Sequence, residues 1–376
     1  MFARIANTPR DYAWGSRTAI AELLGTTPSG GPEAELWLGT HPGSPTRLVD
    51  GSGTLADLVE SGLPFLLKVL AADQPLSLQA HPNSEQAATG FARENAAGIP
   101  VDAPDRNYRD PFHKPELIYA LSEPFRALSG FRPTSEVRAA LAELVDDPRI
   151  AAFDARLVDD SALPEVVAWL IERGDGVDDL VAALVEASAV LDDDSWDAVR
   201  LLSTTWPGDP GIAVSFLLHV VTLHAGEVLY LRAGNIHAYL AGLGVELMSS
   251  SDNVLRGAFT SKHVDVPELL RVLDVQPGPA PHLAPIELEP DVLEFRPDVP
   301  DFRLTVVQDA ALRRGVRVAV PAAGPAILLC TDGSATVTLA DGEQVLARGE
   351  SAYVTGEPSL GLAGRGRVFL ATTELG

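Results

Sequence analysis

The strongest constraint on the fold is a hydrophobic pattern that changes twice along the chain. Residues 1 to about 130 carry short apolar runs separated by Pro and Gly, such as Ala34–Gly39 and Pro64–Leu70, which are typical of strands and turns. From Thr134 to about Trp206, apolar residues recur at helical spacing among Ala, Asp and Glu. A strand-like pattern returns from Ile212. We therefore predict a helical segment inserted between β-rich segments.

The last part of the chain is also predicted to be β-rich. A short helix is expected over Val264–Leu273, followed by an extended, turn-rich linker over Gln276–Pro290. Closely spaced short strands come next and indicate a small barrel or sandwich. We expect three parts: a β domain of residues 1–132 with 207–275, a helical inserted domain of 133–206, and a linker with a C-terminal β domain, 276–376.

Size and charge exclude several classes of protein. A chain of 376 residues is long enough for two or three domains. Its apolar stretches are too short or too interrupted to span a bilayer, and its first residues lack the apolar core of a signal peptide. A net charge of −24 argues against nucleic acid as a partner, since the phosphate backbone would be repelled. We expect a soluble, cytoplasmic protein with no membrane partner, and a monomer.

Two pairs of polar residues have the spacing of one face of a strand. Gln79 and His81 lie two positions apart, and so do Lys114 and Glu116. His237 follows a glycine-containing turn at the end of another strand-like run.

Four of these side chains form a candidate metal site: Gln79, His81, Glu116 and His237. The single cysteine, Cys330, excludes a thiolate-rich site, so any metal must be held by His and by carboxylate or amide oxygens. Two imidazoles, a carboxylate and an amide oxygen suit Zn²⁺ with one position open for water or substrate. Spacing alone leaves open that these histidines are packed core residues. Five other histidines are interpreted as structural or surface residues: His41, His219, His224, His263 and His282.

The segment Gly226–His237 resembles the second sequence motif of the cupins, with Arg232 where that motif usually has Pro. Cupins are small β-barrels that hold a metal between inward-facing side chains. Gln79 and His81 resemble the paired ligands of the first cupin motif. Glu116 comes 35 residues after His81, which places a long insertion between these ligands.

Longer motifs extend the resemblance to the type I mannose-6-phosphate isomerases. The matching stretches are YAWGS (12–16), AELWLGTHP (34–42), LPFLLKVL (63–70), PLSLQAHPN (75–83), NYRDPFHKPELIYAL (107–121), FRALSGFRP (125–133), GNIHAYL (234–240) and VELMSSSDNVLRGAFTSK (245–262). The resemblance is collinear over residues 2–275 and weaker across the helical insertion and the C-terminal β unit. Phe112 stands where the family usually has Asn, and Ser261 lies in RGAFTSK where RAGLTPK is commoner.

The resemblance implies a mainly β fold with a helical insertion: two cupin-like, jelly-roll β-barrel units, the second without metal, plus an α-helical domain. It also implies one Zn²⁺ per chain and a sugar phosphate as substrate. The family interconverts mannose 6-phosphate and fructose 6-phosphate, which requires proton transfer between C1 and C2 through an enediol. Such chemistry needs an acid–base group and a stabiliser for the oxyanion.

Three residues are expected to act in catalysis. Lys114 shares the face of Glu116 and is a candidate acid–base group, although it could instead be only an ion-pair partner of that carboxylate. Arg256 resembles the family's catalytic arginine and is expected to stabilise the enediolate or help hold phosphate. Glu246 is either a base or a buried structural carboxylate.

Substrate binding is assigned to a second group of residues. We expect Ser77 and Lys262 to bind phosphate, the alternative for Lys262 being a cap on the helix that follows it. Lys68 is expected to orient the site, and Trp14 to form a pocket wall, together with Glu35 and Trp37. Only three of the 28 basic residues are lysines, and all three fall in these candidate segments.

Two other functions are compatible with the same ligand set. A non-catalytic metal-containing cupin that binds sugars would keep the four ligands but would not need the three lysines and Arg256. An iron-dependent, oxygen-using cupin would generally use more than two histidines.

Overall fold

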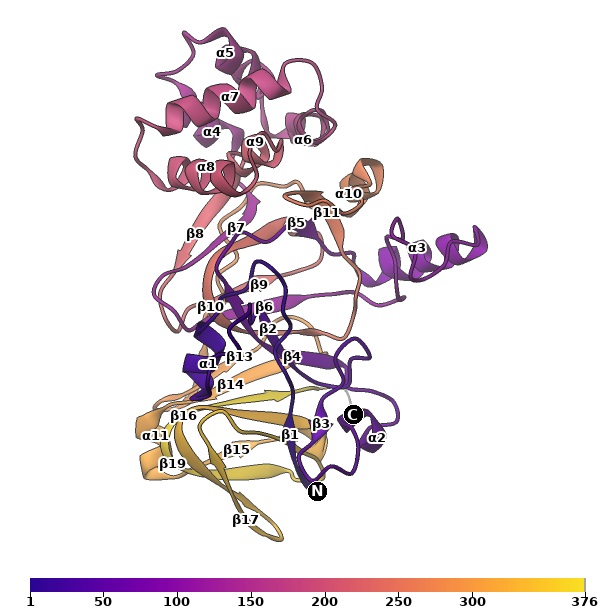
Figure 1. The fold of residues 1–376 in the computed structure, drawn as a ribbon, viewed down its shortest axis with the longest axis vertical. Helices are drawn as coiled ribbons and strands as arrows, with labels where there is room; N and C mark the ends of the chain where they lie inside the picture. Colours follow the sequence, from indigo (N-terminus) through magenta and orange to yellow (C-terminus); the bar gives the residue numbers. More distant parts are fainter. Residues whose placement is uncertain (375–376) are drawn as a thin grey trace.

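Two antiparallel β-sheets and a helical unit at one end make up the chain in the computed structural model, which describes residues 1–374 (Figure 1). One sheet has nine strands and lies between the helical unit and the other sheet, which has ten strands. The mainly β fold with a helical insertion therefore agrees with the sequence-based expectation. Among residues 1–374, no helix is long and apolar enough to cross a membrane.

The nine-stranded sheet is organised around its longest strand, β10. Its strands are β2 (Glu35–Leu38), β4 (Phe65–Ala72), β5 (Leu78–Ala80), β6 (Glu116–Ala120), β7 (Phe125–Phe131), β8 (Leu218–Leu223), β9 (Val228–Leu231), β10 (His237–Ser249) and β11 (Leu255–Ala258). Strand β10 pairs with four of them, β4, β5, β6 and β7. Its register sets His237 opposite Gln79 and Glu246 opposite Lys68.

This sheet curves back on itself. Met248 of β10 is paired with Glu116, and a straight strand would hold His237 about 36 Å from Met248. Nevertheless His237 Nε2 lies 3.3 Å from Glu116 Oε2. A register shift after Tyr239 and a left-handed backbone at Gly242 (φ 131°) lie between the two ends, where a strand can bend.

The ten-stranded sheet joins the two ends of the sequence. Its strands are β1 (Phe2–Ala6), β3 (Arg47–Leu48), β12 (Ile286–Glu289), β13 (Val292–Phe295), β14 (Arg303–Val307), β15 (Val316–Ala319), β16 (Ala326–Leu339), β17 (Gly342–Ala347), β18 (Ser351–Val354) and β19 (Ser359–Thr372). Strand β1 pairs with β18, with Phe2 opposite Val354. Backbone pairing thus places the N-terminal strand in the C-terminal sheet, and not with the rest of residues 1–132 as we expected. Strand β12 also lies inside the expected linker.

The helices are concentrated in the inserted unit. They are α1 (Ala19–Leu24), α2 (Leu55–Leu58), α3 (Ser84–Ala96), α4 (Thr134–Leu141), α5 (Pro148–Asp154), α6 (Leu163–Ile171), α7 (Val177–Ser188), α8 (Asp194–Thr205), α9 (Gly211–Ser215), α10 (Val266–Val272) and α11 (Asp309–Arg314), with short 3₁₀ turns at Asp160–Ala162 and Pro321–Ala323. Helices α4–α9 form the unit seen at the top of Figure 1. The helix expected over 264–273 is confirmed as α10.

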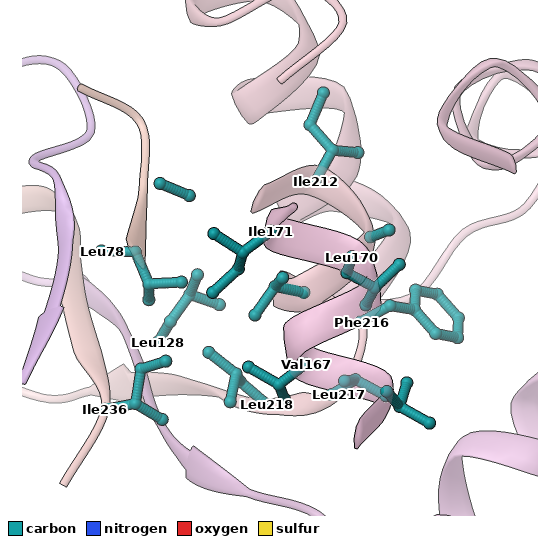
Figure 2. Close-up of a cluster of buried hydrophobic side chains, with 14 of the residues drawn as sticks. Leu78, Leu128, Val167, Leu170, Ile171, Ile212, Phe216, Leu217, Leu218 and Ile236 are labelled. Carbon is teal, nitrogen blue, oxygen red and sulfur yellow. The ribbon is translucent and has the colours of Figure 1, made fainter. Parts of the chain in front are cut away.

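The helical unit ends later than predicted. We expected strand from Ile212, but α9 occupies Gly211–Ser215 and the strand β8 begins only at Leu218. The run is mostly apolar, with Ser215 as its polar residue, because it is buried where helices meet the sheet, and an apolar run this short has no diagnostic periodicity. Figure 2 shows this buried region, where Ile171 of α6 lies beside Leu78 and Leu128 of the sheet and Ile212 of α9 belongs to the same cluster.

Candidate metal centre and substrate site

Three buried side chains converge at one point of the nine-stranded sheet. His81 directly follows β5, Glu116 begins β6 and His237 begins β10. Each is at most 2% exposed, and their ligand atoms all lie within 4.8 Å of one another. The Nε2 atoms of both histidines are 3.3 Å from Glu116 Oε2.

Both imidazoles are oriented by backbone carbonyls outside this cluster. His81 Nδ1 donates to the carbonyl of Asn253 (2.7 Å), and His237 Nδ1 donates to that of Asn235 (3.1 Å). This leaves each Nε2 without a proton and directed towards Glu116. Although His81 Nε2 and Glu116 Oε2 are only 3.3 Å apart, they are not aligned for a hydrogen bond, and neither atom has a hydrogen-bond partner despite burial. A cation between them would satisfy both atoms, so the residues fit a metal ion.

The ionisation states also suit metal binding. Burial, with the nearby Lys114 ammonium, lowers the pKa of His81 to about 4, so the imidazole is neutral at neutral pH. Burial alone would raise the pKa of Glu116, but the Lys114 ammonium outweighs it and holds that pKa well below its usual range. The cluster therefore offers neutral imidazole and ionised carboxylate, the forms that bind metals.

Gln79 lies at the rim of this cluster. Its Nε2 is 3.5 Å from His237 Nε2, as expected from their register across β5 and β10. Rotating the Gln79 side-chain amide by about 180° would direct its Oε1, instead of its Nε2, towards His237 Nε2.

Lys114 and Glu116 share a face, as their spacing predicts. Lys114 Nζ lies 2.7 Å from Glu116 Oε1, the oxygen that does not face the histidines. Lys114 is 6% exposed, so the ion pair is shielded from bulk water. Lys114 is therefore an ion-pair partner of Glu116, and its ammonium also lies beside the cluster of His81, Glu116 and His237.

A second buried ionic group lies next to the first. Lys68 Nζ is 3.0 Å from Glu246 Oε2 and 3.6 Å from Glu35 Oε1, and it also lies over the ring of Trp37. Tyr239 donates to the other oxygen of Glu246 (2.9 Å). Burial would lower the pKa of Lys68, but the Glu246 and Glu35 carboxylates outweigh it and raise that pKa, so Lys68 is charged.

A group of three cations lies on the β11 side of the site: Arg109, Arg256 and Lys262. Arg256 is paired with Gln79 across β11 and β5 and is half-buried. Burial, followed by repulsion from Arg109, lowers the pKa of Arg256. Burial, followed by repulsion from Arg256 and Arg109, lowers the pKa of Lys262. An anionic ligand would relieve this repulsion.

Arg109 was missed in the sequence analysis, although it lies in the stretch NYRDPFHKPEL, five positions before Lys114. The alternative role of Lys262 as a helix cap is wrong, because Asp265 takes that position in α10 and accepts a hydrogen bond from Glu268 N. Ser77, half-buried, directly precedes β5 and so lies near the start of the strand that carries Gln79.

Trp14 is placed by contacts outside the metal cluster. It stacks on Tyr12 with ring centres 5.8 Å apart and packs against the apolar cluster that contains Tyr239. Phe112, which departs from the family pattern, is 59% exposed. Its carbonyl, not its side chain, accepts hydrogen bonds from Asn253 Nδ2 (2.8 Å) and Ser251 Oγ (3.2 Å). A change of side chain at position 112 therefore leaves this contact intact.

His41 and His113 have more specific partners than the sequence indicated. His41 is buried and its Nε2 lies 3.2 Å from Asp252 Oδ1, while its Nδ1 accepts from Gly43 N. His113 Nε2 lies 3.0 Å from Asp301 Oδ1, in the loop between β13 and β14 of the other sheet. Both contacts join segments far apart in sequence, which spacing does not reveal.

Comparisons with known proteins agree with this geometry. Residues 2–134 match the family model of the type I phosphomannose isomerase catalytic domain. The mannose-6-phosphate isomerases of Salmonella typhimurium and Escherichia coli are 37% and 39% identical, each over 99% of this chain and 100% of the relative. A Salmonella typhimurium mannose 6-phosphate isomerase structure with bound fructose 6-phosphate and zinc superposes with a TM-score of 0.90 at 37% identity, covering all of both chains. The chain therefore belongs to the type I mannose-6-phosphate isomerase family.

Proposed function

We propose that this chain is a zinc-dependent aldose–ketose isomerase that interconverts mannose 6-phosphate and fructose 6-phosphate. The observation that carries the proposal is the convergence of His81, Glu116 and His237 with an unpaired Nε2 and an unpaired carboxylate oxygen in a buried place. A relative that spans the whole chain has been crystallised with zinc and fructose 6-phosphate, which supports the choice of both ligands.

One zinc ion per chain would be held by Gln79 Oε1, His81 Nε2, Glu116 Oε2 and His237 Nε2. When bound, Zn²⁺ supplies Lewis-acid polarisation of a substrate oxygen. Lys114, bonded to Glu116 Oε1, orients that carboxylate and keeps Oε2 free for the ion.

The reaction moves a proton between C2 and C1 of the open-chain sugar through an enediol. Lys114 is our candidate for the group that holds this proton, because its Nζ lies beside the ligand cluster and is shielded from bulk water. To accept the proton from carbon it would act as the neutral amine, and it would return the proton as the ammonium. Glu246 is assigned a structural role, since Lys68 and Tyr239 already occupy its two oxygens. Lys68 in turn stabilises the buried carboxylates of Glu246 and Glu35.

The substrate's phosphate would be bound by Ser77, Arg256 and Lys262, with Arg109 as a further contact. A net charge of −24 repels a dianion at long range, so binding must come from such short-range contacts. Arg256 lies opposite Gln79 and can reach either the phosphate or the charge that develops at C1 and C2. Trp14 and Trp37 are proposed as pocket walls.

For the architecture, we propose two cupin-like β units with the helical domain inserted in the first. The first would comprise residues 7–46, 49–132 and 216–275 and carry the metal. The second would comprise residues 276–374 with β1 and β3, which pair within its sheet. The cytoplasmic location and the monomeric state stay predictions.

The proposal is tested by a coupled assay of the purified protein with mannose 6-phosphate. We expect fructose 6-phosphate to form, the activity to disappear after chelation and Zn²⁺ to restore it. A protein that binds zinc and sugar phosphate but forms no product would instead be the non-catalytic, sugar-binding alternative.

A further inference from the structure

Asn253 joins the metal cluster to the segment that carries the cations. It is fully buried, and its backbone carbonyl accepts the 2.7 Å hydrogen bond that orients His81. Its side chain bonds a different part of the chain, residues 109–112, which lead from Arg109 towards Lys114.

The side-chain amide uses both of its ends. Its Oδ1 accepts from Arg109 N (2.7 Å) and Asp110 N (3.3 Å), while its Nδ2 donates to the carbonyls of Asp110 and Phe112, each at 2.8 Å. The amide is therefore needed as acceptor and donor together, which neither a carboxylate nor an apolar side chain can provide.

Two neighbours of Asn253 reinforce the same contact. Ser251 Oγ donates to Asp110 Oδ1 (2.9 Å) and accepts from Asn253 N (3.2 Å). The backbone N–H of Asp252 donates to Asp110 Oδ2 (2.8 Å). Residues 251–253 and 109–112 are thus held together by hydrogen bonds at several points, with His81 bonded to one side.

We propose that Asn253 is a positioning residue that fixes His81 and the segment bearing Arg109 and Lys114 in one arrangement. The inference rests on the function proposed above and assigns Asn253 no contact with substrate. If so, the distance between the metal site at His81 and the side chains of Arg109 and Lys114 depends on the side-chain amide of Asn253.

The test is the variant Asn253→Asp in the full chain. The change keeps the acceptor for Arg109 N but sets a carboxylate oxygen against two carbonyls and the Asp110 carboxylate, which repel it. Residues 251–253 must then move away from residues 109–112, and the backbone carbonyl of Asn253, which orients His81, moves with its segment. We expect zinc affinity, measured by competition with a chelator, to fall about 10- to 100-fold, the range for residues that orient metal ligands. The KM for mannose 6-phosphate should rise and kcat should fall as well.

Asn107→Asp is the matched control. Asn107 lies in the same stretch, and its Nδ2 donates to Asp265 Oδ2 (2.9 Å). Asn107→Asp therefore sets a new carboxylate against the Asp265 carboxylate, as Asn253→Asp does against that of Asp110. The side chain of Asn107 makes no bond to residues 251–253. We expect it to lower the melting temperature and to leave zinc affinity unchanged. Equal losses of zinc affinity in both variants would show a merely structural role and overturn the proposal.

Two further outcomes are separable. If Asn253→Asp does not fold, Ser251→Ala weakens the same contact more gently and should lower zinc affinity in the same direction; unchanged affinity there overturns the inference. If the wild-type protein does not isomerise mannose 6-phosphate, the proposed function fails, while the zinc measurements still decide the role of Asn253.

Discussion

At the residue scale, buried charges are arranged so that a single carboxylate oxygen is left for a cation. Glu116 Oε1 is taken by Lys114, and both oxygens of Glu246 are taken by Lys68 and Tyr239. Glu116 Oε2 alone of these oxygens faces two imidazole nitrogens without a hydrogen bond. A buried carboxylate oxygen without a hydrogen-bond partner is costly, so a cation bound at Oε2 would stabilise the arrangement.

Removing either imidazole should therefore remove the metal. We expect about one zinc per chain in the purified protein, and its loss in His81→Ala and in His237→Ala, because each change deletes a ligand. Metal analysis by atomic emission checks this, with His224→Ala as control, since His224 is exposed and pairs with Glu123. Full zinc content in both ligand variants would exclude the site as described.

Lys262 should act on the phosphate and Lys114 on the reacting carbons. We expect Lys262→Ala to raise the KM for mannose 6-phosphate about 10-fold or more, the loss of one charge-assisted contact. Its effect on unphosphorylated mannose should be small, because that substrate lacks the phosphate. Lys114→Ala should instead lower kcat for both sugars. Equal losses on the two sugars for Lys262→Ala would remove Lys262 from the phosphate site.

The lowered pKa of Lys262 predicts a pH dependence. Burial and the charges of Arg256 and Arg109 bring this pKa below 10.5, so the side chain loses its proton at a lower pH than an ordinary lysine. Only the protonated form attracts an anion, so affinity for inorganic phosphate should fall as the pH rises towards 10.5. Lys262→Arg keeps its charge over this range and should lose less affinity in calorimetric titrations. Parallel losses in both proteins would contradict the assignment.

At this scale, local spacing predicted some residues of the candidate site and could not predict others. Strand alternation correctly placed Lys114 and Glu116 on one face, since only neighbouring positions are involved. Arg109 and Asn253 meet across 144 sequence positions through a side-chain amide and a backbone N–H. No periodicity encodes such a contact, so both were missed.

At the element scale, helix α3 shows what a pattern analysis overlooks. The hydrophobic pattern predicts strands and turns in this region, yet Asn83 and Gln86 form a capping box at the start of a 13-residue helix. The helix is polar on most faces, because it packs on the molecule mainly through small residues such as Gly90 and through the buried carboxylate of Glu94. Glu94 accepts from the backbone N–H groups of Asn107 and Tyr108, which fixes the start of the stretch that leads to Arg109.

Gly90 is needed where α3 meets Tyr108. A Cβ at Gly90 would lie 2.3 Å from the Tyr108 ring, which is buried and bonded through its hydroxyl to Glu268 (2.7 Å). We expect Gly90→Ala to destabilise the protein by about 1–3 kcal/mol, since overpacking outweighs the roughly 1 kcal/mol gain in helix propensity. Denaturant unfolding measures the change. Gly278→Ala, where a methyl group meets no atom within 4 Å, is the control and should be near neutral; equal stability of the two variants would contradict the prediction.

At the scale of the whole molecule, the two sheets share one apolar core. Tyr119 of β6 contacts Phe295 and Phe369 of the C-terminal sheet, with ring centres 5.7 and 5.1 Å apart. The same cluster includes Val69 of β4 and Ile5 of β1. This shared core was not predictable, because it depends on pairings between the two ends of the chain, as between Phe2 and Val354. Composition changes at the linker, which predicts separate β units, but composition says nothing of contacts across the linker.

Because the two sheets share a core, we expect a substitution in the C-terminal sheet to weaken zinc binding in the other sheet. Phe369 and Leu370 are neighbours on β19, both fully buried, but Phe369 packs in the shared core and Leu370 in a cluster made largely by the C-terminal sheet alone. Phe369→Ala should destabilise the protein by about 3–5 kcal/mol and Leu370→Ala by about 2–5 kcal/mol.

Only Phe369→Ala removes the support of Tyr119, which lies on the strand that Glu116 begins. We expect it alone to weaken zinc binding in chelator competition, because a loosened β6 holds its carboxylate less firmly. If both variants bound zinc like the wild type, the two sheets would be independent as far as the metal is concerned, and the C-terminal sheet would stabilise the molecule without acting on the site.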